Sequence, residues 1–223
     1  MLRHLIDIFF PPACRLCGKP LHRHESIICN TCLDRLPFTG YAFDNANKAA
    51  QVLQSKIRIY KATSLLFYNK NGSIGKLIHL LKYHGQTGIG KKLGELTAPV
   101  LASDPPDIII PMPLHPKKFR KRGYNQTETF GKTIARKLDA TYRDDILLKT
   151  VHTESQTAKS PLERWKNVAG TFHVENPGQL RGQHVLVIDD VLTAGATLAA
   201  AVQKLERDDI RISVATMAFN RPE

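Results

Sequence analysis

The stretch VLVIDDVLTAGATL, residues 185–198, decides the fold of this chain. Its apolar, β-branched start predicts a buried strand over residues 183–189. That strand carries Asp189 and Asp190 to its carboxyl end, and a loop of small residues then leads into a predicted helix over residues 194–207. Ligands bind at the carboxyl ends of strands in open α/β sheets, so we expect the functional site here.

The loop after this strand has the composition of a phosphate-binding turn. Thr193 and Thr197 supply hydroxyl groups, and the small residues between them, Ala194, Gly195 and Ala196, let the backbone approach a ligand. Backbone N–H groups at the start of the next helix complete an anion site that needs no lysine. The stretch is not a Walker A motif, because the pattern G-x-x-x-x-G-K-[ST] does not occur in the sequence.

Two carboxylates beside a phosphate site require an explanation, because like charges repel. A phosphorylated sugar provides one. The loop would hold its phosphate, while Asp189 and Asp190 would accept hydrogen bonds from its hydroxyl groups. The alternative is a strand end whose aspartate caps the following helix.

Strands and helices alternate from about residue 60 onward. Strand signals occur at residues 62–68, 107–111, 145–151, 183–189 and 210–219, and helical periodicity at residues 73–84, 88–101, 123–138 and 194–207. This alternation predicts an α/β fold, with a mostly parallel sheet and helices on both faces. We expect this domain to span residues 61–223, behind a linker at residues 41–60 that contains one short helix near residues 46–55.

The cysteines form a pattern typical of a metal site. All four lie in one C-x2-C-x11-C-x2-C arrangement: Cys14, Cys17, Cys29 and Cys32. Two such knuckles bring four thiolates onto one tetrahedral Zn²⁺ and leave no open position, so the predicted zinc is structural. Residues 1–40 are therefore expected to form an N-terminal helix and a small zinc-binding domain, with His22 and His24 facing solvent. The alternative is two disulfides or reactive thiols, and a cytosolic location disfavours disulfides.

The chain is strongly basic. Its formal net charge is +12, and five of the six residues 117–122 are Lys or Arg. Such a balance favours nucleic acid, phosphorylated metabolites or an anionic membrane surface as partners, with solubility alone as the alternative. No apolar stretch approaches the roughly 20 residues of a spanning helix. Asp7, Pro11 and Pro12 interrupt the apolar N-terminus, which does not resemble a signal peptide, so we expect a cytoplasmic protein.

Three more segments narrow the family. They are FYNKNGSIGKLIHLLKYHG at residues 67–85, IPMPLHPKKFRKRGYNQ at residues 110–126 and SQTAKSPLERWKNVAGTF at residues 155–172. Together with the cysteine knuckles, they resemble the ComF family of competence-associated, phosphoribosyltransferase-like proteins. Residues 185–198 closely resemble the signature with which type I phosphoribosyltransferases bind 5-phosphoribosyl-1-pyrophosphate (PRPP). The resemblance covers nearly the whole chain.

The resemblance implies a type I phosphoribosyltransferase fold behind a zinc knuckle, with a site for PRPP and Mg²⁺. Asp189 and Asp190 would hold the ribose hydroxyls, and residues 193–197 the 5′-phosphate. The family often has Thr-Thr-Gly where this chain has Thr193, Ala194 and Gly195, which removes one hydroxyl and keeps the backbone cradle. The resemblance also implies a role in natural transformation, with single-stranded DNA and an ATP-driven DNA translocase as partners.

Residues 111–115 match the position of a pyrophosphate-binding loop in such enzymes. Basic residues that follow are therefore candidates to meet pyrophosphate or a nucleic-acid backbone, above all Arg122, Lys117 and Lys118. The alternative for these side chains is a solvated basic face.

Residues 153–170 match the position of a mobile lid. Gln156, Arg164 and Asn167 are the candidates to close on pyrophosphate, and Arg164 is a candidate catalytic residue beside the two aspartates. A polar surface loop is the alternative. Trp165 stands in the same segment, beside a basic residue, and is expected either to stack on a base or to pack inside the protein.

Two other residues leave similar choices open. Tyr124 either stacks on bases of single-stranded nucleic acid or packs inside the protein, and Lys82 either reaches the site or lies on a helix surface. Three functions fit these features. They are transfer of phosphoribosyl to an acceptor that the sequence does not reveal, catalytically inactive binding of single-stranded DNA for a translocase, and regulation by PRPP sensing.

Overall fold

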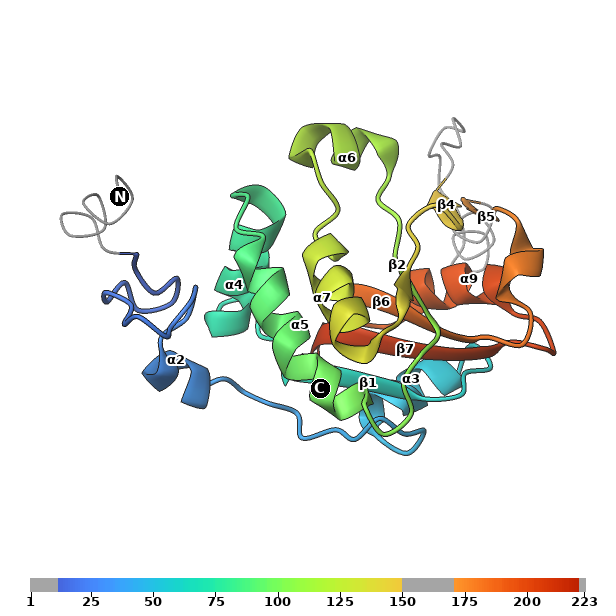
Figure 1. Ribbon diagram of the computed structural model, residues 1–223, viewed down its shortest axis with the longest axis horizontal. Helices are drawn as coiled ribbons and strands as arrows, with labels where there is room; N and C mark the ends of the chain where they lie inside the picture. The colour runs from blue at the N-terminus through green and yellow to red at the C-terminus, as the bar shows by residue number, and fades with distance from the viewer. Residues whose placement is uncertain (1–11, 150–170, 221–223) are drawn as a thin grey trace, which may run out of the picture.

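The computed structural model describes residues 12–149 and 171–220. They form a five-stranded sheet with helices on both faces and a cysteine-bearing lobe at one end (Figure 1). The strand order is β1 (Ala62–Phe67), β7 (Arg211–Phe219), β6 (His184–Leu192), β2 (Ile108–Pro111) and β3 (Thr141–Tyr142). All neighbouring strands of this sheet are parallel, which confirms the predicted α/β architecture.

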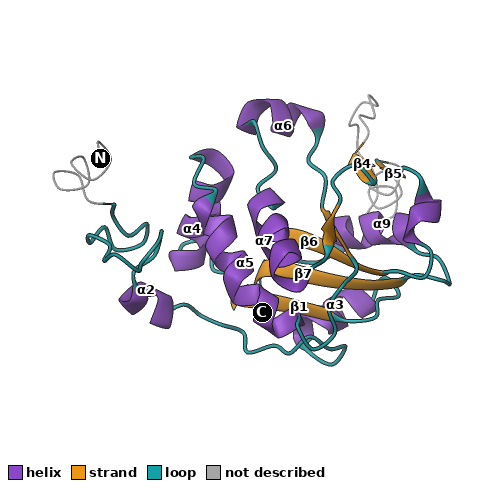
Figure 2. Cartoon of the chain, in the orientation of Figure 1, coloured by secondary structure: helices purple, strands orange, loops and turns teal. Residues whose placement is uncertain are grey.

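The helices divide between the two faces of the sheet (Figure 2). Helices α4 (Ser73–Tyr83), α5 (Gly88–Leu101) and α7 (Glu128–Leu138) cover one face, and α3 (Lys48–Gln54) and α9 (Ala196–Leu205) cover the other. Side chains of β6 alternate between these layers: Leu186 and Ile188 pack with the first group, and Val185 and Val187 with the second. Burial on both faces explains why this strand is apolar throughout.

The predicted helix over residues 123–138 is wrong at its start. The basic run forms its own helix, α6 (Pro116–Arg122), and α7 begins only at Glu128. Pro116 occupies the first turn of α6, and Gly123 ends it with a φ of 78°, donating its N–H to the carbonyl of Phe119. Proline at a helix start and a left-handed glycine after its end are the usual boundary signals, and they outweigh the helical periodicity here.

Three strands differ from prediction because their pairing is not local. β3, which pairs with β2, was not predicted. β6 runs past the predicted end at Asp189 as far as Leu192, because Val191 and Leu192 still pair with β7. β4 (Leu147–Lys149) was expected, but its antiparallel partner β5 (Phe172–Val174) was not. A three-residue strand carries too little pattern to be recognised by itself. The turn η1 (Pro177–Leu180) follows β5.

Residues 41–60 pack against the sheet. Asp44 bridges to Ala62, and the α3 residues Ala49 and Leu53 are fully buried. Helix α2 (Asn30–Asp34) lies in the cysteine lobe. The division of the chain at residues 40 and 60 stays a prediction, and the expected N-terminal helix falls in residues 1–11, outside the described residues. In the part of the chain that the structure describes, every helix is too short or too polar to cross a membrane.

Candidate functional site

The predicted phosphate loop lies where β6 passes into α9. Gly195 adopts a φ of +74°, and a Cβ atom there would stand 3.3 Å from Leu53 Cδ2, so the position requires glycine. Thr193, Ala194, Ala196 and Thr197 around it are exposed. The first four N–H groups of a helix have no partner within it, and they carry a positive partial charge. The loop therefore offers hydroxyl and N–H donors to an anion.

Asp190 is buried but not isolated. Lys82, next to the end of α4, places its Nζ 3.0 Å from Oδ1 and 2.9 Å from Oδ2 of Asp190. The Nε2 of Gln126 donates to Oδ2 at 2.7 Å. Of the two interpretations of Lys82, the structure supports the one that brings it to the site.

A chain of contacts connects α6 to this carboxylate. Arg122 Nη1 donates to Gln126 Oε1 at 2.6 Å, and Gln126 in turn donates to Asp190. The Arg122 guanidinium also lies over the Tyr83 ring, 5.0 Å from its centroid. The predicted site residue Arg122 thus reaches the acidic pair through an amide side chain that the sequence did not single out.

Asp189 has different surroundings. Its Oδ1 accepts the backbone N–H of Asp190 at 2.8 Å. Burial, and then the negative charge of Asp190, raise the pKa of Asp189 to about 7, against the opposing charges of Lys82 and Lys149. The Asp189 carboxyl is therefore partly protonated near neutral pH, and a bound cation or sugar hydroxyl would favour its ionised form.

Lys149 on β4 is a site residue that sequence reasoning missed. Burial lowers its pKa, the charge of Lys118 lowers it further, and Asp189 opposes both. Its Nζ lies 4.9 Å from the centroid of the Phe172 ring. Lys118 and Lys149 thus approach the Asp189 side of the site. No local signal marks Lys149, because β4 is placed by pairing with β5.

The other predicted residues fall into two groups. Lys117 is exposed on α6, and Tyr124 donates its hydroxyl to the carbonyl of Leu81, which ties the chain before α7 to α4. Asn125 fixes the same segment by donating to the carbonyl of Met112 at 3.0 Å. The lid candidates lie outside the described residues: Gln156, Arg164, Trp165 and Asn167.

The cysteines converge as predicted. All four Sγ atoms lie within 4.8 Å of one another, and those of Cys17 and Cys29 are 3.7 Å apart. A tetrahedral ZnS₄ centre with Zn–S bonds of about 2.3 Å has sulfur–sulfur edges of about 3.8 Å. All four are unpaired thiols, and the N–H of Cys29 points at Cys14 Sγ at 3.4 Å. The set fits one structural zinc ion.

The electrostatics of the four thiols also favour a bound cation. Burial opposes ionisation of Cys14, but N–H groups of Cys17, Cys29 and Leu16 outweigh it and lower its pKa to about 6. Burial and the neighbouring sulfur atoms raise the pKa of Cys32 to about 12. One thiolate therefore forms readily and the full set does not, unless a metal charge stabilises all four.

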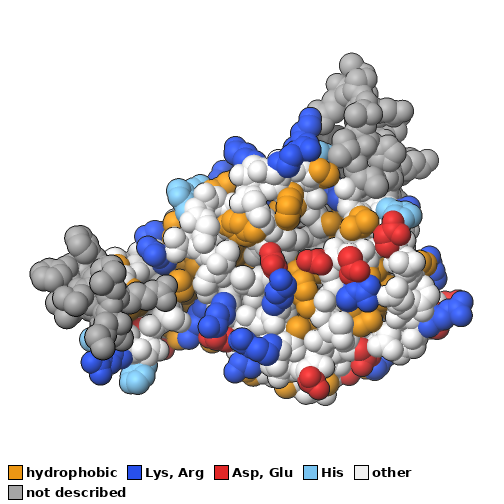
Figure 3. All heavy atoms as spheres, turned by 45° about the horizontal axis from the view of Figure 1, so that its top comes forward, with side chains coloured by type: hydrophobic (Ala, Val, Ile, Leu, Met, Phe, Trp, Pro, Cys, Tyr) orange, Lys and Arg blue, Asp and Glu red, His pale blue; other side chains and the backbone are white. Residues whose placement is uncertain are grey.

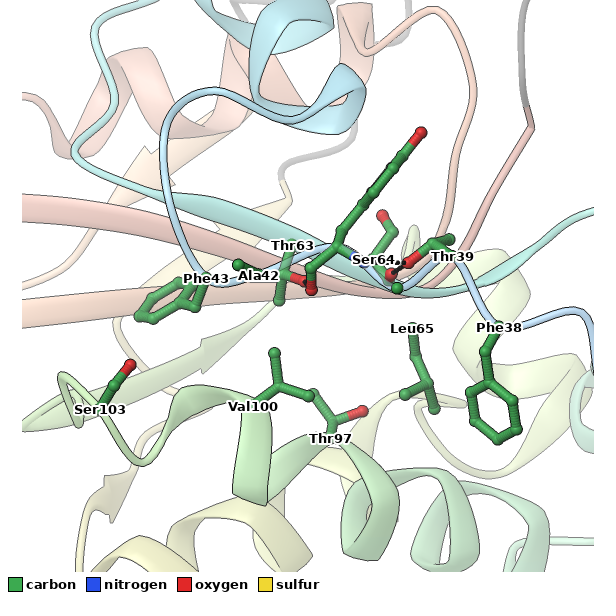
Figure 4. Close-up of a pocket in the computed structure, with 12 residues that line it drawn as sticks. Phe38, Thr39, Ala42, Phe43, Thr63, Ser64, Leu65, Thr97, Val100 and Ser103 are labelled. Atoms are coloured by element: carbon green, nitrogen blue, oxygen red, sulfur yellow. Dashed lines mark hydrogen bonds between the residues drawn. The ribbon is translucent and has the colours of Figure 1, made fainter.

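A separate cavity of about 420 Å³ lies along the outer edge of β1, away from the acidic pair (Figure 4). The segment at residues 38–43, β1 and the end of α5 enclose it, with Thr97 and Val100 pointing in from the helix. Its lining has no charged side chain among the described residues. Nothing in its chemistry selects a ligand.

Comparison with known proteins agrees with this geometry. Residues 126–223 match the model of the phosphoribosyl transferase domain. Competence protein F of Haemophilus influenzae is 26% identical over 222 residues, which cover 92% of this chain and 96% of the relative. DNA utilization protein YhgH of Escherichia coli O157:H7 is 26% identical over 197 residues, 87% of this chain and 78% of the relative. These similarities support the expected resemblance to the ComF family.

The matched domain begins at Gln126, the residue that donates to Asp190, and it includes both acids and the loop. The protein has a type I phosphoribosyltransferase fold. Among solved structures, adenine phosphoribosyltransferase from Leishmania tarentolae is 16% identical, with 78% of this chain and 77% of that chain covered and a TM-score of 0.38. So weak a likeness adds nothing to the domain match and the sheet topology.

Proposed function

We propose that this protein binds PRPP, or a related ribose phosphate, together with Mg²⁺, and that it does so in the cytoplasm as part of DNA uptake. One observation carries the proposal: β6 delivers Asp189 and Asp190 directly in front of a glycine-shaped loop and the N-terminus of α9. Acceptors for sugar hydroxyls at the end of the strand are thus followed directly by donors for a phosphate in the loop. A simple anion site would not need two acids beside it.

Each group has a role in this proposal. The loop from Thr193 to Thr197 holds the 5′-phosphate, and Asp189 and Asp190 accept hydrogen bonds from the ribose hydroxyls. Mg²⁺, for which carboxylate and phosphate oxygens are suitable ligands, would neutralise charge on the pyrophosphate. Lys82 already holds Asp190, so an arriving sugar must share or displace that ammonium.

The pyrophosphate end of the site is assigned to basic side chains. Arg122 and Lys118 on α6 would meet it, together with Lys149 on β4, whose pKa responds to the charges of both Lys118 and Asp189. Gln156 and Arg164 remain the candidates to close over it, with Arg164 as a catalytic residue. Transfer would move phosphoribosyl from pyrophosphate to an acceptor, in a site that positions the sugar and excludes water. Regulation by PRPP sensing would use the same site without transfer.

Calorimetric titration of PRPP with Mg²⁺ tests the site. Wild type should bind, and the double variant Asp189→Asn/Asp190→Asn should lose binding by at least about tenfold, because each charged hydrogen bond contributes roughly 1.5–3 kcal/mol. Asp208→Asn is the control, since Asp208 is a fully exposed acid that pairs only loosely with Arg58, at 3.9 Å. No binding to folded, zinc-loaded wild type would refute the proposal.

A second candidate function is binding of single-stranded DNA for an ATP-driven translocase. It rests on α6, which projects at the top of the molecule in Figure 1 and exposes Lys117, Lys118, Arg120 and Lys121. The relatives carry the names DNA utilization protein and Competence protein F. Phosphate contacts by these cations make binding fall steeply with salt.

Fluorescence anisotropy of a labelled single-stranded oligonucleotide against salt concentration tests this second function. Neutralising the four exposed cations with glutamine should lower the slope of log affinity against log salt by up to about 3, at about 0.7 per lost contact. Arg58→Gln, far from α6 at an exposed position, is the control. A salt-independent affinity, or no affinity in wild type, would exclude it.

A further inference from the structure

Two neighbouring cavities form a groove along α4, outside the phosphate loop. One, of about 490 Å³, extends from Tyr68 to Tyr83. The other, of about 400 Å³, reaches Cys17 and Cys32 in the cysteine lobe. Asn71, Gly72 and Lys76 line both cavities, so the two meet there. The groove thus extends from the predicted zinc site toward the acidic pair.

The lining of this groove combines aromatic rings with cations. Tyr68, His79 and Tyr83 supply the rings, and the cations are Arg35, Lys70, Lys76 and Lys82. No Asp or Glu occurs among the described residues that line either cavity. In Figure 3 a few Lys, Arg and His side chains lie on the upper left of the face that is drawn, and acidic side chains gather nearer its centre.

Tyr83 has the surroundings of a stacking residue. Its side chain is exposed, with a relative accessibility of 55%. The Arg122 guanidinium lies 5.0 Å from its ring centroid, and the His79 ring lies at the same distance, tilted by 49°. An exposed ring beside a guanidinium and a second ring can accept a nucleobase by stacking.

The two ends of the groove are fixed by contacts across the fold. Lys76 Nζ donates to the carbonyl of Leu16 at 2.8 Å, which joins α4 to the cysteine lobe. At the other end, Lys82 pairs with Asp190 at 2.9 Å. The groove therefore depends on the lobe for its outer wall and ends beside the candidate ribose site.

We propose that this groove binds a single-stranded nucleic acid, with one base stacked on Tyr83 and the backbone phosphates held by Lys70 and Lys76. The inference rests on the second candidate function above and adds to α6 a second binding surface, which holds the base. Cations spaced between aromatic rings, without any carboxylate, suit a strand in which phosphates and bases alternate. An acidic peptide would use the cations and leave the rings without a partner.

Two matched double variants test the surface, each removing one exposed aromatic and one exposed lysine. Tyr83→Ala/Lys70→Gln alters the groove, and Phe119→Ala/Lys117→Gln alters α6, where Phe119 is 50% exposed. Binding of an oligothymidylate of about 15 nucleotides should weaken about tenfold or more in the groove variant and by less than about threefold in the α6 variant. Equal losses, or the reverse order, would overturn the proposal.

Further measurements separate this proposal from the functions on which it builds. The single variant Lys70→Gln should bind PRPP with Mg²⁺ as wild type does, because Lys70 lies outside the loop and the acidic pair and, unlike Tyr83, does not hold Arg122. Wild type that binds no oligothymidylate would exclude the second function as a whole. Thymidine monophosphate should compete poorly, because it offers one phosphate. Equal competition by the mononucleotide or by polyglutamate would contradict a strand-binding groove.

Photo-crosslinking gives a readout that does not depend on affinity. An oligonucleotide carrying 5-iodouracil should crosslink to Tyr83 or His79, identified by mass spectrometry of the labelled peptide. Labelling confined to α6 would contradict the groove.

Discussion

The cysteine lobe and the carboxyl edge of the sheet are built in opposite ways. The four sulfur atoms of the lobe come from residues 14–32 and lie within 4.8 Å of one another. The edge brings together Lys82 and Asp190, which are 108 positions apart, and Gln126 and Asp190, which are 64 apart. Local spacing therefore specifies the first site, and only the assembled sheet specifies the second. Four predictions separate the two.

The largest effect is expected from removing the metal of the lobe. Cys14→Ser should abolish stoichiometric zinc and unfold the lobe, because a structural zinc ion contributes roughly 10–16 kcal/mol of apparent binding energy in small domains. Metal analysis and limited proteolysis measure this. PRPP binding should change by less than about threefold if the edge is built independently.

His22→Ala is the matched control for zinc, since His22 is expected to face solvent and not to bind the ion. It should retain one zinc per chain. Freshly purified wild type without zinc would contradict the whole assignment.

The second effect concerns the ion pair at the edge. Lys82→Ala leaves the buried Asp190 carboxylate with Gln126 as its remaining side-chain partner, and should lower the free energy of unfolding by about 2–3 kcal/mol. This loss is smaller than is usual for breaking a buried ion pair, because Lys82 stays 23% exposed. Urea denaturation measures it.

Lys132→Ala is the control for this pair. Lys132 pairs with Glu128 one turn away and is 55% exposed, so the loss should stay near 0.5 kcal/mol. In a double-mutant cycle, Lys82→Ala should cost much less in an Asp190→Asn background. Simple additivity would show that the two groups do not interact.

The third effect is a pH dependence that only the edge should show. The folded-state pKa of Asp189, about 7, exceeds the ordinary aspartate value of 3.8, so the folded protein retains a proton that the unfolded chain has lost. The free energy of unfolding should therefore fall as pH rises from about 4 to about 7, by about 1–3 kcal/mol. Asp189→Asn should flatten this slope in urea denaturation at several pH values.

The same titration should appear in ligand binding. PRPP affinity should rise by up to about tenfold between about pH 6 and pH 8, because sugar hydroxyls donate to the ionised carboxylate. Asp189→Asn is the control, because the ligand's own phosphates titrate in the same way with the variant and with wild type. An equal pH slope in the variant would contradict the role of Asp189.

The smallest effect tests the loop conformation. Gly195→Ala forces a side chain into a left-handed backbone against Leu53 and should destabilise the protein by about 1–2 kcal/mol. PRPP binding should weaken several-fold. Gly178→Ala is the control, because a Cβ atom at Gly178 meets nothing within 4 Å. Equal thermal shifts in the two variants would show that the loop is not constrained.

Much of the site could be predicted because its parts are continuous in sequence. The strand that carries Asp189 and Asp190, the loop around Gly195 and the helix after it follow one another, and each has its own local signal. The cysteine spacing is equally local. The features that were missed or left open are of another kind: β3, β5, Lys149, the role of Gln126 and the choice between the two interpretations of Lys82 depend on contacts between distant segments.

The sequence by itself determined the strand–loop–helix unit, the four-cysteine site and the excess of positive charge, because each follows from residue type and spacing over short range. Only the tertiary structure decided which partners the two acids have. It gave Asp190 a lysine and an amide, raised the pKa of Asp189, and joined the cysteine lobe to α4 along a groove. Burial and charge depend on what packs nearby in space, and chain folding alone determines those neighbours.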